Sequence, residues 1–110
     1  MPRRPSILLL ASLALLAAPA LATTPTFYPR PGNLPFSEAV QAGDMLYLSG
    51  ILAEGGDGKV VSGGVEPEAK RVMQLLGEAL ARHRLGYDDV VQCTVLLAEM
   101  KDCPAFNMIY

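Results

Sequence analysis

Residues 34–50 decide the fold of this chain, and they read LPFSEAVQAGDMLYLSG. Two short runs, residues 39–41 and 45–49, lie on either side of a turn signal, Ala42-Gly43-Asp44, and this pattern favours a β-hairpin. The second strand ends on Ser49, next to Gly50, where the missing side chain lets another backbone or a ligand approach closely. The arrangement is typical of a small-molecule pocket at the end of a sheet.

An amphipathic pattern and an apolar segment follow the hairpin. Apolar residues recur at three- and four-residue steps over residues 65–85, which predicts a helix with one apolar face. Gly86 is the residue expected to stop it. Residues 90–98 are apolar on both faces apart from Gln92 and Thr94, and they predict a strand that is covered on both sides. The helix is expected to cover one face of this strand, and covering the other face requires a partner.

Shorter elements complete the domain. Residues 23–35 carry four prolines and are expected to form an extended lead-in without regular structure. Residues 55–58 form a glycine-rich turn before a short strand at residues 59–62. Asp102 is the expected N-cap of a final short helix, with Pro104 tolerated in its first turn.

The first 22 residues have the pattern of a secretory signal peptide. Arg3 and Arg4 precede an apolar run at residues 7–17, and Ala20-Leu21-Ala22 offers a small-residue cleavage site. The run falls short of the roughly 20 apolar residues that span a bilayer, although an uncleaved membrane anchor is the alternative. We therefore expect a leader at residues 1–22, the lead-in at 23–35 and a domain at 36–110. The expected location is periplasmic or secreted, without stable membrane association once the leader is cleaved.

Composition limits the classes of function. After the leader the chain carries 7 basic and 11 acidic residues, and nothing in this balance suggests nucleic-acid binding, which usually shows as a basic face. Its 88 residues suit one small domain that buries little more than ~60% of its unfolded surface and would gain from a partner. Cys93 lies within the expected strand and Cys103 beyond its end, farther apart than the ~7 Å that a disulfide allows. With one distant histidine, His83, they do not form a metal site.

Several short motifs, in order and spacing, resemble the RidA (YjgF) family over about residues 31–110. They are Pro35-Phe36-Ser37, Ala39-Val40, Ala42-Gly43-Asp44, Leu48-Ser49-Gly50, Gly63-Gly64-Val65-Glu66, Asp88-Asp89-Val90-Val91, Thr94-Val95 and Ala105-Phe106-Asn107-Met108-Ile109-Tyr110. The resemblance implies a chorismate-mutase-like α+β domain, β-β-β-α-β-α, whose last strands are missing here. It also implies a homotrimer with pockets between its subunits.

The activity implied by the resemblance is hydrolysis of reactive 2-imino or enamine acids to 2-oxo acids and ammonia, without metal or organic cofactor. Because an imine carbon is already electrophilic, the protein need only hold the substrate carboxylate and position one water. In the family, an arginine beyond the last residue of this chain binds the carboxylate bidentately, and a late glutamate orders the water. The chain as given lacks both and is expected to be poorly active or inactive by itself.

The resemblance assigns four residues to substrate binding: Phe36, Ser49, Gly50 and Asn107. Phe36 stands where many active members have tyrosine, and Ile51 replaces a common glutamine. Each polar residue also has a structural interpretation, since Ser49 can end its strand by bonding to backbone and Asn107 can be a surface residue. Two other functions stay open. Besides the deaminase, the alternatives are a non-catalytic ligand-binding relative and a truncated remnant without activity.

Overall fold

The computed structural model describes residues 21–110. They divide into two compact units, and the boundary along the chain lies between Tyr47 and Leu48. Each unit is described by itself. The expected leader lies outside the described residues apart from its last two positions. Among residues 21–110, no helix is both long enough and apolar enough to cross a membrane.

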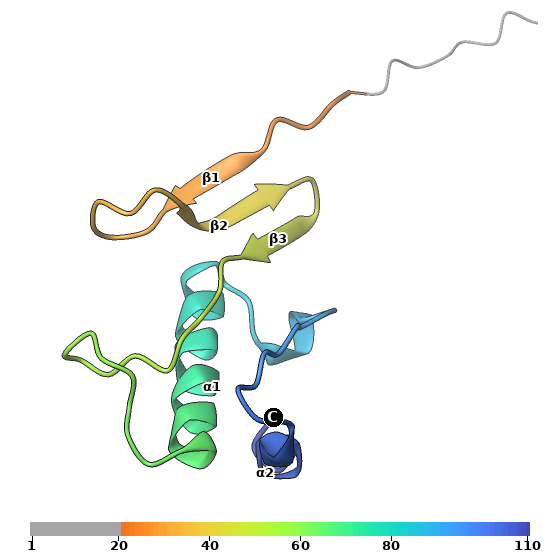
Figure 1. Ribbon diagram of the computed structural model, residues 1–110. Coiled ribbons are helices and arrows are strands. Elements are labelled where there is room, and N and C mark those ends of the chain that lie inside the picture. The colour runs from red at the N-terminus through yellow and green to blue at the C-terminus, as the bar shows by residue number, and fades with distance from the viewer. Residues whose placement is uncertain (1–20) are drawn as a thin grey trace, which may run out of the picture. The chain divides into compact units, whose positions relative to one another are not determined.

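The first unit is built around a small sheet with the strand order β1-β2-β3 (Figure 1). β1 is Thr26–Pro29, β2 is Ser37–Ala42 and β3 is Met45–Leu48. β1 runs antiparallel to β2, with Thr26 opposite Gln41 and Tyr28 opposite Ala39. The Tyr28 hydroxyl also donates a hydrogen bond to Oε1 of Gln41 at 3.0 Å, which ties the two strands together.

The predicted hairpin is confirmed as β2 and β3. Gly43 and Asp44 form its two-residue turn, and Gly43 has a φ of 59°, in the left-handed region that tight hairpin turns require. The strand β2 begins two residues earlier than predicted, at Ser37. β3 ends one residue earlier than predicted, at Leu48, so Ser49 and Gly50 directly follow the hairpin.

β1 corrects the expectation that residues 23–35 lack regular structure. The run Thr26-Phe27-Tyr28 consists of residues that favour strands, and this preference outweighs the neighbouring prolines. Because β1 is an edge strand, Pro29 is tolerated at its end, where the register with β2 becomes irregular. The prediction was wrong for residues 26–29.

The second unit contains the predicted long helix, α1, Val65–Arg82. Glu66 and Glu68 lie in its first turn, where negative charge complements the helix dipole. Lys70 pairs with Glu66 one turn away at 2.8 Å. This hydrogen bond and the ammonium charge lower the pKa of the Glu66 carboxyl, but both side chains are exposed, so the pair belongs to the solvated face.

The C-terminus of α1 differs from the prediction, because the helix ends at Arg82 and not at residue 85. Arg84, not Gly86, takes the left-handed conformation, with a φ of 60°. The amides of Arg84 and Leu85 donate to the carbonyls of Ala81 and Leu80, each at 3.0 Å. This is a Schellman motif with arginine at the position that glycine usually occupies.

Arg84→Gly is therefore expected to stabilise the protein. A residue with a side chain costs about 1–2 kcal/mol in the left-handed region, and glycine removes this strain. Glycine also loses more conformational entropy on folding, which offsets part of the gain. The expected net gain is about 0.5–1 kcal/mol, measured as a rise in melting temperature by circular dichroism. Arg82→Gly, inside the helix, is the control and should lower the melting temperature. A fall for Arg84→Gly as well would contradict this account.

The predicted strand at residues 90–98 is not formed in the described chain. A strand requires a neighbour for its backbone hydrogen bonds, and no strand within residues 21–110 pairs with this segment. Val90 is extended, with φ −76° and ψ 118°, but Val91 is 77% exposed and Leu96 is 92% exposed. The apolar pattern was read correctly, whereas the strand assignment was wrong for the single chain.

Two other short elements differ from expectation. The strand predicted at residues 59–62 is reduced to one antiparallel bridge between Glu54 and Val60, closed by a hydrogen bond from the Val61 amide to the Ala53 carbonyl at 2.9 Å. The final helix, α2, is confirmed as Cys103–Asn107, preceded by the 3₁₀ helix η2 at Met100–Asp102. The Asp102 side chain, however, makes no capping hydrogen bond.

The 3₁₀ helix η1, Tyr87–Asp89, lies between α1 and the apolar segment. Oδ2 of Asp89 accepts a hydrogen bond from the Gly86 amide at 2.8 Å, so this carboxylate closes a turn. The Tyr87 hydroxyl donates to the carbonyl of Met73 in α1 at 2.5 Å. Tyr87 thereby fixes the chain that leaves α1 against the middle of that helix.

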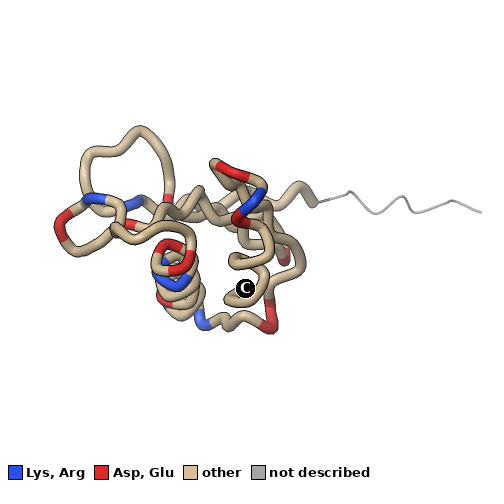
Figure 2. Tube along the Cα trace, turned by 60° about the horizontal axis from the view of Figure 1, so that its bottom comes forward, with Lys and Arg blue, Asp and Glu red and all other residues tan. Residues whose placement is uncertain are grey.

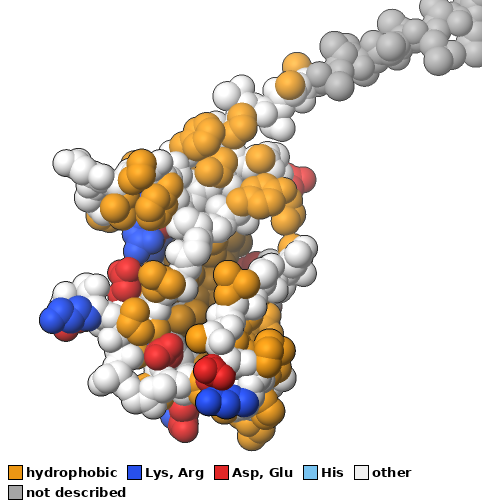
Figure 3. Space-filling view, in the orientation of Figure 1, with side chains coloured by type: hydrophobic (Ala, Val, Ile, Leu, Met, Phe, Trp, Pro, Cys, Tyr) orange, Lys and Arg blue, Asp and Glu red, His pale blue; other side chains and the backbone are white. Residues whose placement is uncertain are grey.

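The buried core is small. Among residues 21–110, the buried apolar side chain of the first unit is Ala39, and those of the second unit are Ala53, Ala69, Ala79, Leu80 and Phe106. Many larger apolar side chains are exposed instead, and they appear as orange surface in several places in Figure 3. Basic and acidic positions alternate along the Cα trace in Figure 2.

Candidate functional site

The four residues assigned to substrate binding come from both units. Phe36 precedes β2 in the first unit, whereas Ser49, Gly50 and Asn107 belong to the second. Within residues 21–110, the described hydrogen bonds do not join any two of these four residues to each other. Each position is therefore characterised by its own surroundings.

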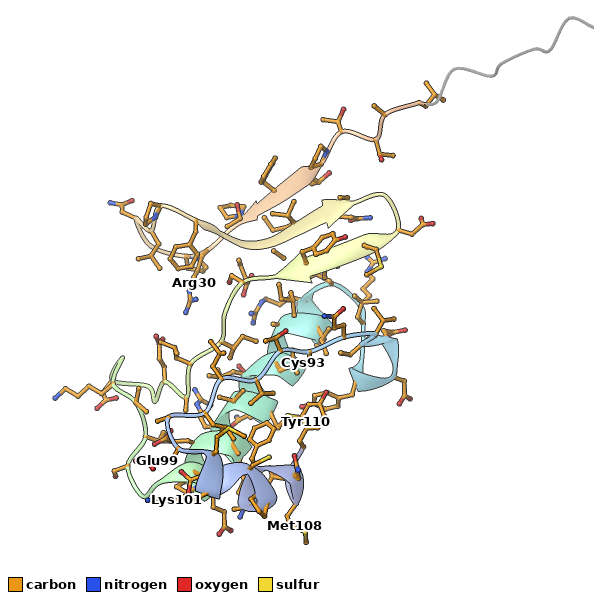
Figure 4. All side chains as sticks on the ribbon, turned by 45° about the vertical axis from the view of Figure 1, so that its right-hand side comes forward. Arg30, Cys93, Glu99, Lys101, Met108 and Tyr110 are labelled. Atoms are coloured by element: carbon orange, nitrogen blue, oxygen red, sulfur yellow. The ribbon has the colours of Figure 1, made fainter. Side chains whose placement is uncertain are left out.

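Phe36 lies at the end of the loop that connects β1 to β2, and its side chain is 47% exposed. Cζ of Arg30 lies 5.7 Å from the centroid of the Phe36 ring, which is within the range of a cation–π contact. Arg30 is half-buried and begins the same loop (Figure 4). Phe36, assigned to substrate binding by the resemblance, is thus an exposed aromatic ring with a cation over it.

Ser49 and Gly50 follow β3 in a stretch without regular structure; Ser49 is half-buried and Gly50 is exposed. A Cβ atom added to Gly50 would meet no other atom within 4 Å. Neither crowding nor a positive φ within the described chain demands glycine at this position. The space at the Cβ position of Gly50 is open within the described chain.

Asn107 is the last residue of α2 and is exposed. Its Nδ2 donates a weak hydrogen bond to Sγ of Cys103, one turn earlier, at 3.7 Å. The adjacent Phe106 is buried at 8% exposure and stacks on Tyr110 with ring centroids 5.6 Å apart. Burial of Phe106 fixes the orientation of α2, and therefore the direction in which Asn107 points.

Sequence reasoning missed three contacts near these positions. It assigned no role to Arg30, and it did not identify Cys103 as the partner of Asn107. It also missed that Nε of Arg71 donates to the Glu54 carbonyl at 2.6 Å and holds the glycine-rich loop to α1. The spacing of Cys103 and Asn107, four residues apart on a helix, was the one usable signal.

No metal centre is found among the described residues: within 21–110, no group of three or more His, Cys, Asp and Glu side chains is placed to hold an ion. Cys93 and Cys103 are both free, and Cys93 is exposed. The chemistry offered by the candidate positions is that of one hydroxyl, one amide, an open backbone and an aromatic ring beside a guanidinium. Hydroxyl and amide groups of this kind hydrogen-bond small polar molecules in proteins in general.

The fold and the motifs agree with known proteins. The crystal structure of yeast Mmf1 has a TM-score of 0.69 and 32% identity, and the match covers 79% of this chain and 73% of that protein. The α+β, YjgF-like fold predicted from the sequence is therefore confirmed.

The sequence matches a family model described as endoribonuclease L-PSP over residues 29–110. It is 42% identical over 77 residues to a Mus musculus protein and 39% identical over 82 residues to a Homo sapiens protein, both named 2-iminobutanoate/2-iminopropanoate deaminase. These matches cover 69% and 73% of this chain, but 57% and 60% of the relatives, so the chain spans somewhat over half of their length. The chain belongs to the endoribonuclease L-PSP family, also called the RidA or YjgF family.

Proposed function

We propose that the complete protein hydrolyses reactive 2-imino acids, and their enamine tautomers, to 2-oxo acids and ammonia. The observation that carries the proposal is the 42% identity, over 77 residues, to a protein named for this deamination. The region that the family model matches, residues 29–110, includes the hairpin that presents Ser49 and Gly50 and the helix that carries Asn107. Because the chain spans 57% of that relative, the proposal concerns the full-length protein.

The chemistry of the reaction suits a site of this kind. Water adds to the electrophilic C2 carbon, a proton passes to nitrogen, and the C–N bond breaks to leave a 2-oxo acid and ammonia. Neither electrons nor a metal are required, so we propose that the protein works without a cofactor. The hydroxyl of Ser49 and the amide of Asn107 supply hydrogen bonds that hold the substrate and the attacking water. Positioning of this kind contributes much of an acceleration.

We also propose that the protein acts as a homotrimer. In the first unit, large apolar side chains of the sheet are exposed, including Phe27 at 64% and Tyr47 at 59%. In the second unit, Val91 and Leu96 leave the unpaired segment apolar and exposed. Apolar surface of this extent favours association, and a neighbouring chain would supply the cover that residues 90–98 lack. We further propose that the protein is exported and that its leader is cleaved after residue 22.

Ammonia release tests the activity. Full-length protein is mixed with 2-iminopropanoate generated in situ, and ammonia and pyruvate are measured against buffer alone. The expected result is acceleration proportional to protein concentration. The same preparation is incubated with single-stranded RNA, because the family description names an endoribonuclease. With a formal net charge of −2, the chain is expected to leave the RNA intact. Bound ligand without ammonia release would favour the non-catalytic alternative.

Asn107→Ala is expected to lower kcat/KM for the imine about tenfold, because one hydrogen bond to substrate or water is lost in the transition state. Met108→Ala, at a neighbouring side chain that is 86% exposed, is the matched control and should keep the activity of the parent protein. Steady-state kinetics on both variants make the comparison. Equal kcat/KM values for Asn107→Ala and the parent would remove Asn107 from the site.

A further inference from the structure

The side chains of Cys103 and Asn107 are in contact, one turn apart on α2. Nδ2 of Asn107 donates a hydrogen bond to Sγ of Cys103 at 3.7 Å. Cys103 is half-buried, whereas Asn107 is exposed. The contact therefore ties one end of an exposed amide to a more enclosed part of the helix.

The backbone that carries this pair is fixed at both ends of α2. Pro104 lies in the first turn and restricts the chain there. After the last residue of the helix, the amides of Ile109 and Tyr110 both donate to the carbonyl of Phe106, which is itself buried. The freedom left to Asn107 is rotation of its own side chain, including the half-turn that exchanges the amide nitrogen and oxygen.

The bond to sulfur favours one of these two orientations. A primary amide has a donor at its nitrogen end and an acceptor at its oxygen end. With Nδ2 bonded to Cys103, Oδ1 is the end left for a ligand, and within residues 21–110 it accepts no hydrogen bond. An exposed amide oxygen accepts from N–H and O–H groups but repels another acceptor. It therefore distinguishes an imine nitrogen, which carries N–H, from the carbonyl oxygen of a 2-oxo acid.

We propose that Cys103 is a positioning residue that sets the specificity of Asn107. By holding Nδ2, it presents Oδ1 to the N–H of the 2-imino substrate and disfavours the carbonyl of the 2-oxo product. The substrate class rests on the proposed function, whereas the orientation of the amide rests on the contact with sulfur. Because the nitrogen gains protons as it leaves as ammonia, an acceptor beside it binds the transition state more strongly than the substrate.

Cys103→Ala in the full-length protein tests this role, because alanine suits a helix and removes the sulfur. The freed amide can turn either end to the ligand. We expect kcat/KM for 2-iminopropanoate to fall about three- to fivefold, as for a partly lost neutral hydrogen bond. Competitive inhibition by 2-oxobutanoate, which has no N–H, should become about twofold stronger, because Nδ2 can then donate to its carbonyl. A merely structural loss would weaken both.

Two further variants make the comparison specific. Cys103→Ser keeps an acceptor at the same position and should lie between Cys103→Ala and the parent protein in both measurements. Cys93→Ala removes an exposed thiol from the same unit and is the matched control. It should change both values by less than about 1.5-fold, as expected for an exposed position.

A double-mutant cycle separates positioning from any other effect of the sulfur. In an Asn107→Ala background no amide remains, so Cys103→Ala should then change kcat/KM by less than about 1.5-fold. The NMR order parameter of the Asn107 side-chain amide gives a readout that needs no activity. It should fall in Cys103→Ala and stay unchanged in Cys93→Ala, since the bond to sulfur restricts the amide.

Parallel weakening of imine turnover and 2-oxobutanoate inhibition in Cys103→Ala would overturn the proposal, and so would parent values in both. Circular dichroism verifies folding, and Cys103→Ser carries the comparison if Cys103→Ala does not fold. A parent protein that releases no ammonia would refute the deaminase, while the order parameter would still decide whether Cys103 holds the amide. Ammonia release by the parent, with an unchanged order parameter in Cys103→Ala, would refute the positioning role alone.

Discussion

Phe106→Ala is expected to lower the free energy of unfolding by about 3 kcal/mol, because truncation of a buried phenylalanine removes its transfer free energy and leaves a cavity. The side chain is only 8% exposed and belongs to α2, which packs against α1 in the second unit. The other buried side chains of residues 48–110 are three alanines and one leucine, so this ring is the largest buried group in the second unit. Urea unfolding monitored by circular dichroism measures the loss.

Tyr110→Ala is the matched control for Phe106→Ala. Tyr110 stacks on Phe106 but is 59% exposed, so its truncation should cost about 1 kcal/mol or less. Asn107 follows Phe106 directly, so Phe106→Ala should also weaken the imine chemistry more than Tyr110→Ala does. Equal losses of stability for the two variants would show that α2 is not anchored through Phe106.

Gly77→Ala is expected to destabilise the protein by about 1–2 kcal/mol, although alanine is the better helix former by about 1 kcal/mol. A Cβ atom at position 77 would lie 2.5 Å from the hydroxyl oxygen of Tyr87 and 3.1 Å from its Cζ. The ring must move, and the hydrogen bond from Tyr87 to the Met73 carbonyl is then lost. Thermal unfolding of the single variant measures the net effect.

A double-mutant cycle tests the cause of this destabilisation. In a Tyr87→Ala background the ring is absent, so the intrinsic preference of the helix decides and Gly77→Ala should stabilise by about 0.5–1 kcal/mol. The sign of the same substitution is thus expected to reverse with the residue at position 87. If Gly77→Ala stabilises the protein in both backgrounds, Tyr87 does not pack on α1 as described.

The elements that were predictable from the sequence are those set by local rules. The hairpin follows from Ala42-Gly43-Asp44 between two short runs, and α1 follows from apolar residues at helical spacing. The end of α1 was not predictable in detail, because local sequence does not decide which residue adopts the left-handed conformation. Gly86 was expected to stop the helix, yet Arg84 adopts the left-handed conformation. In that conformation the amides of residues 84 and 85 donate hydrogen bonds to helix carbonyls.

The errors elsewhere have a different origin, in contacts between distant parts of the chain. Residues 90–98 have the apolar pattern of a strand, but a strand exists only where a partner supplies hydrogen bonds. β1 forms because β2 pairs with it, despite the prolines around it. The contact between Arg30 and Phe36 depends on how the loop turns at Gly32, which residue spacing alone does not reveal.

The activity itself is tested most directly by the initial rate of ammonia formation from 2-iminopropanoate with the full-length protein. This account predicts a rate that rises linearly with protein, saturates with imine and falls about tenfold in kcat/KM for Asn107→Ala. A folded full-length protein that releases ammonia no faster than buffer would contradict it.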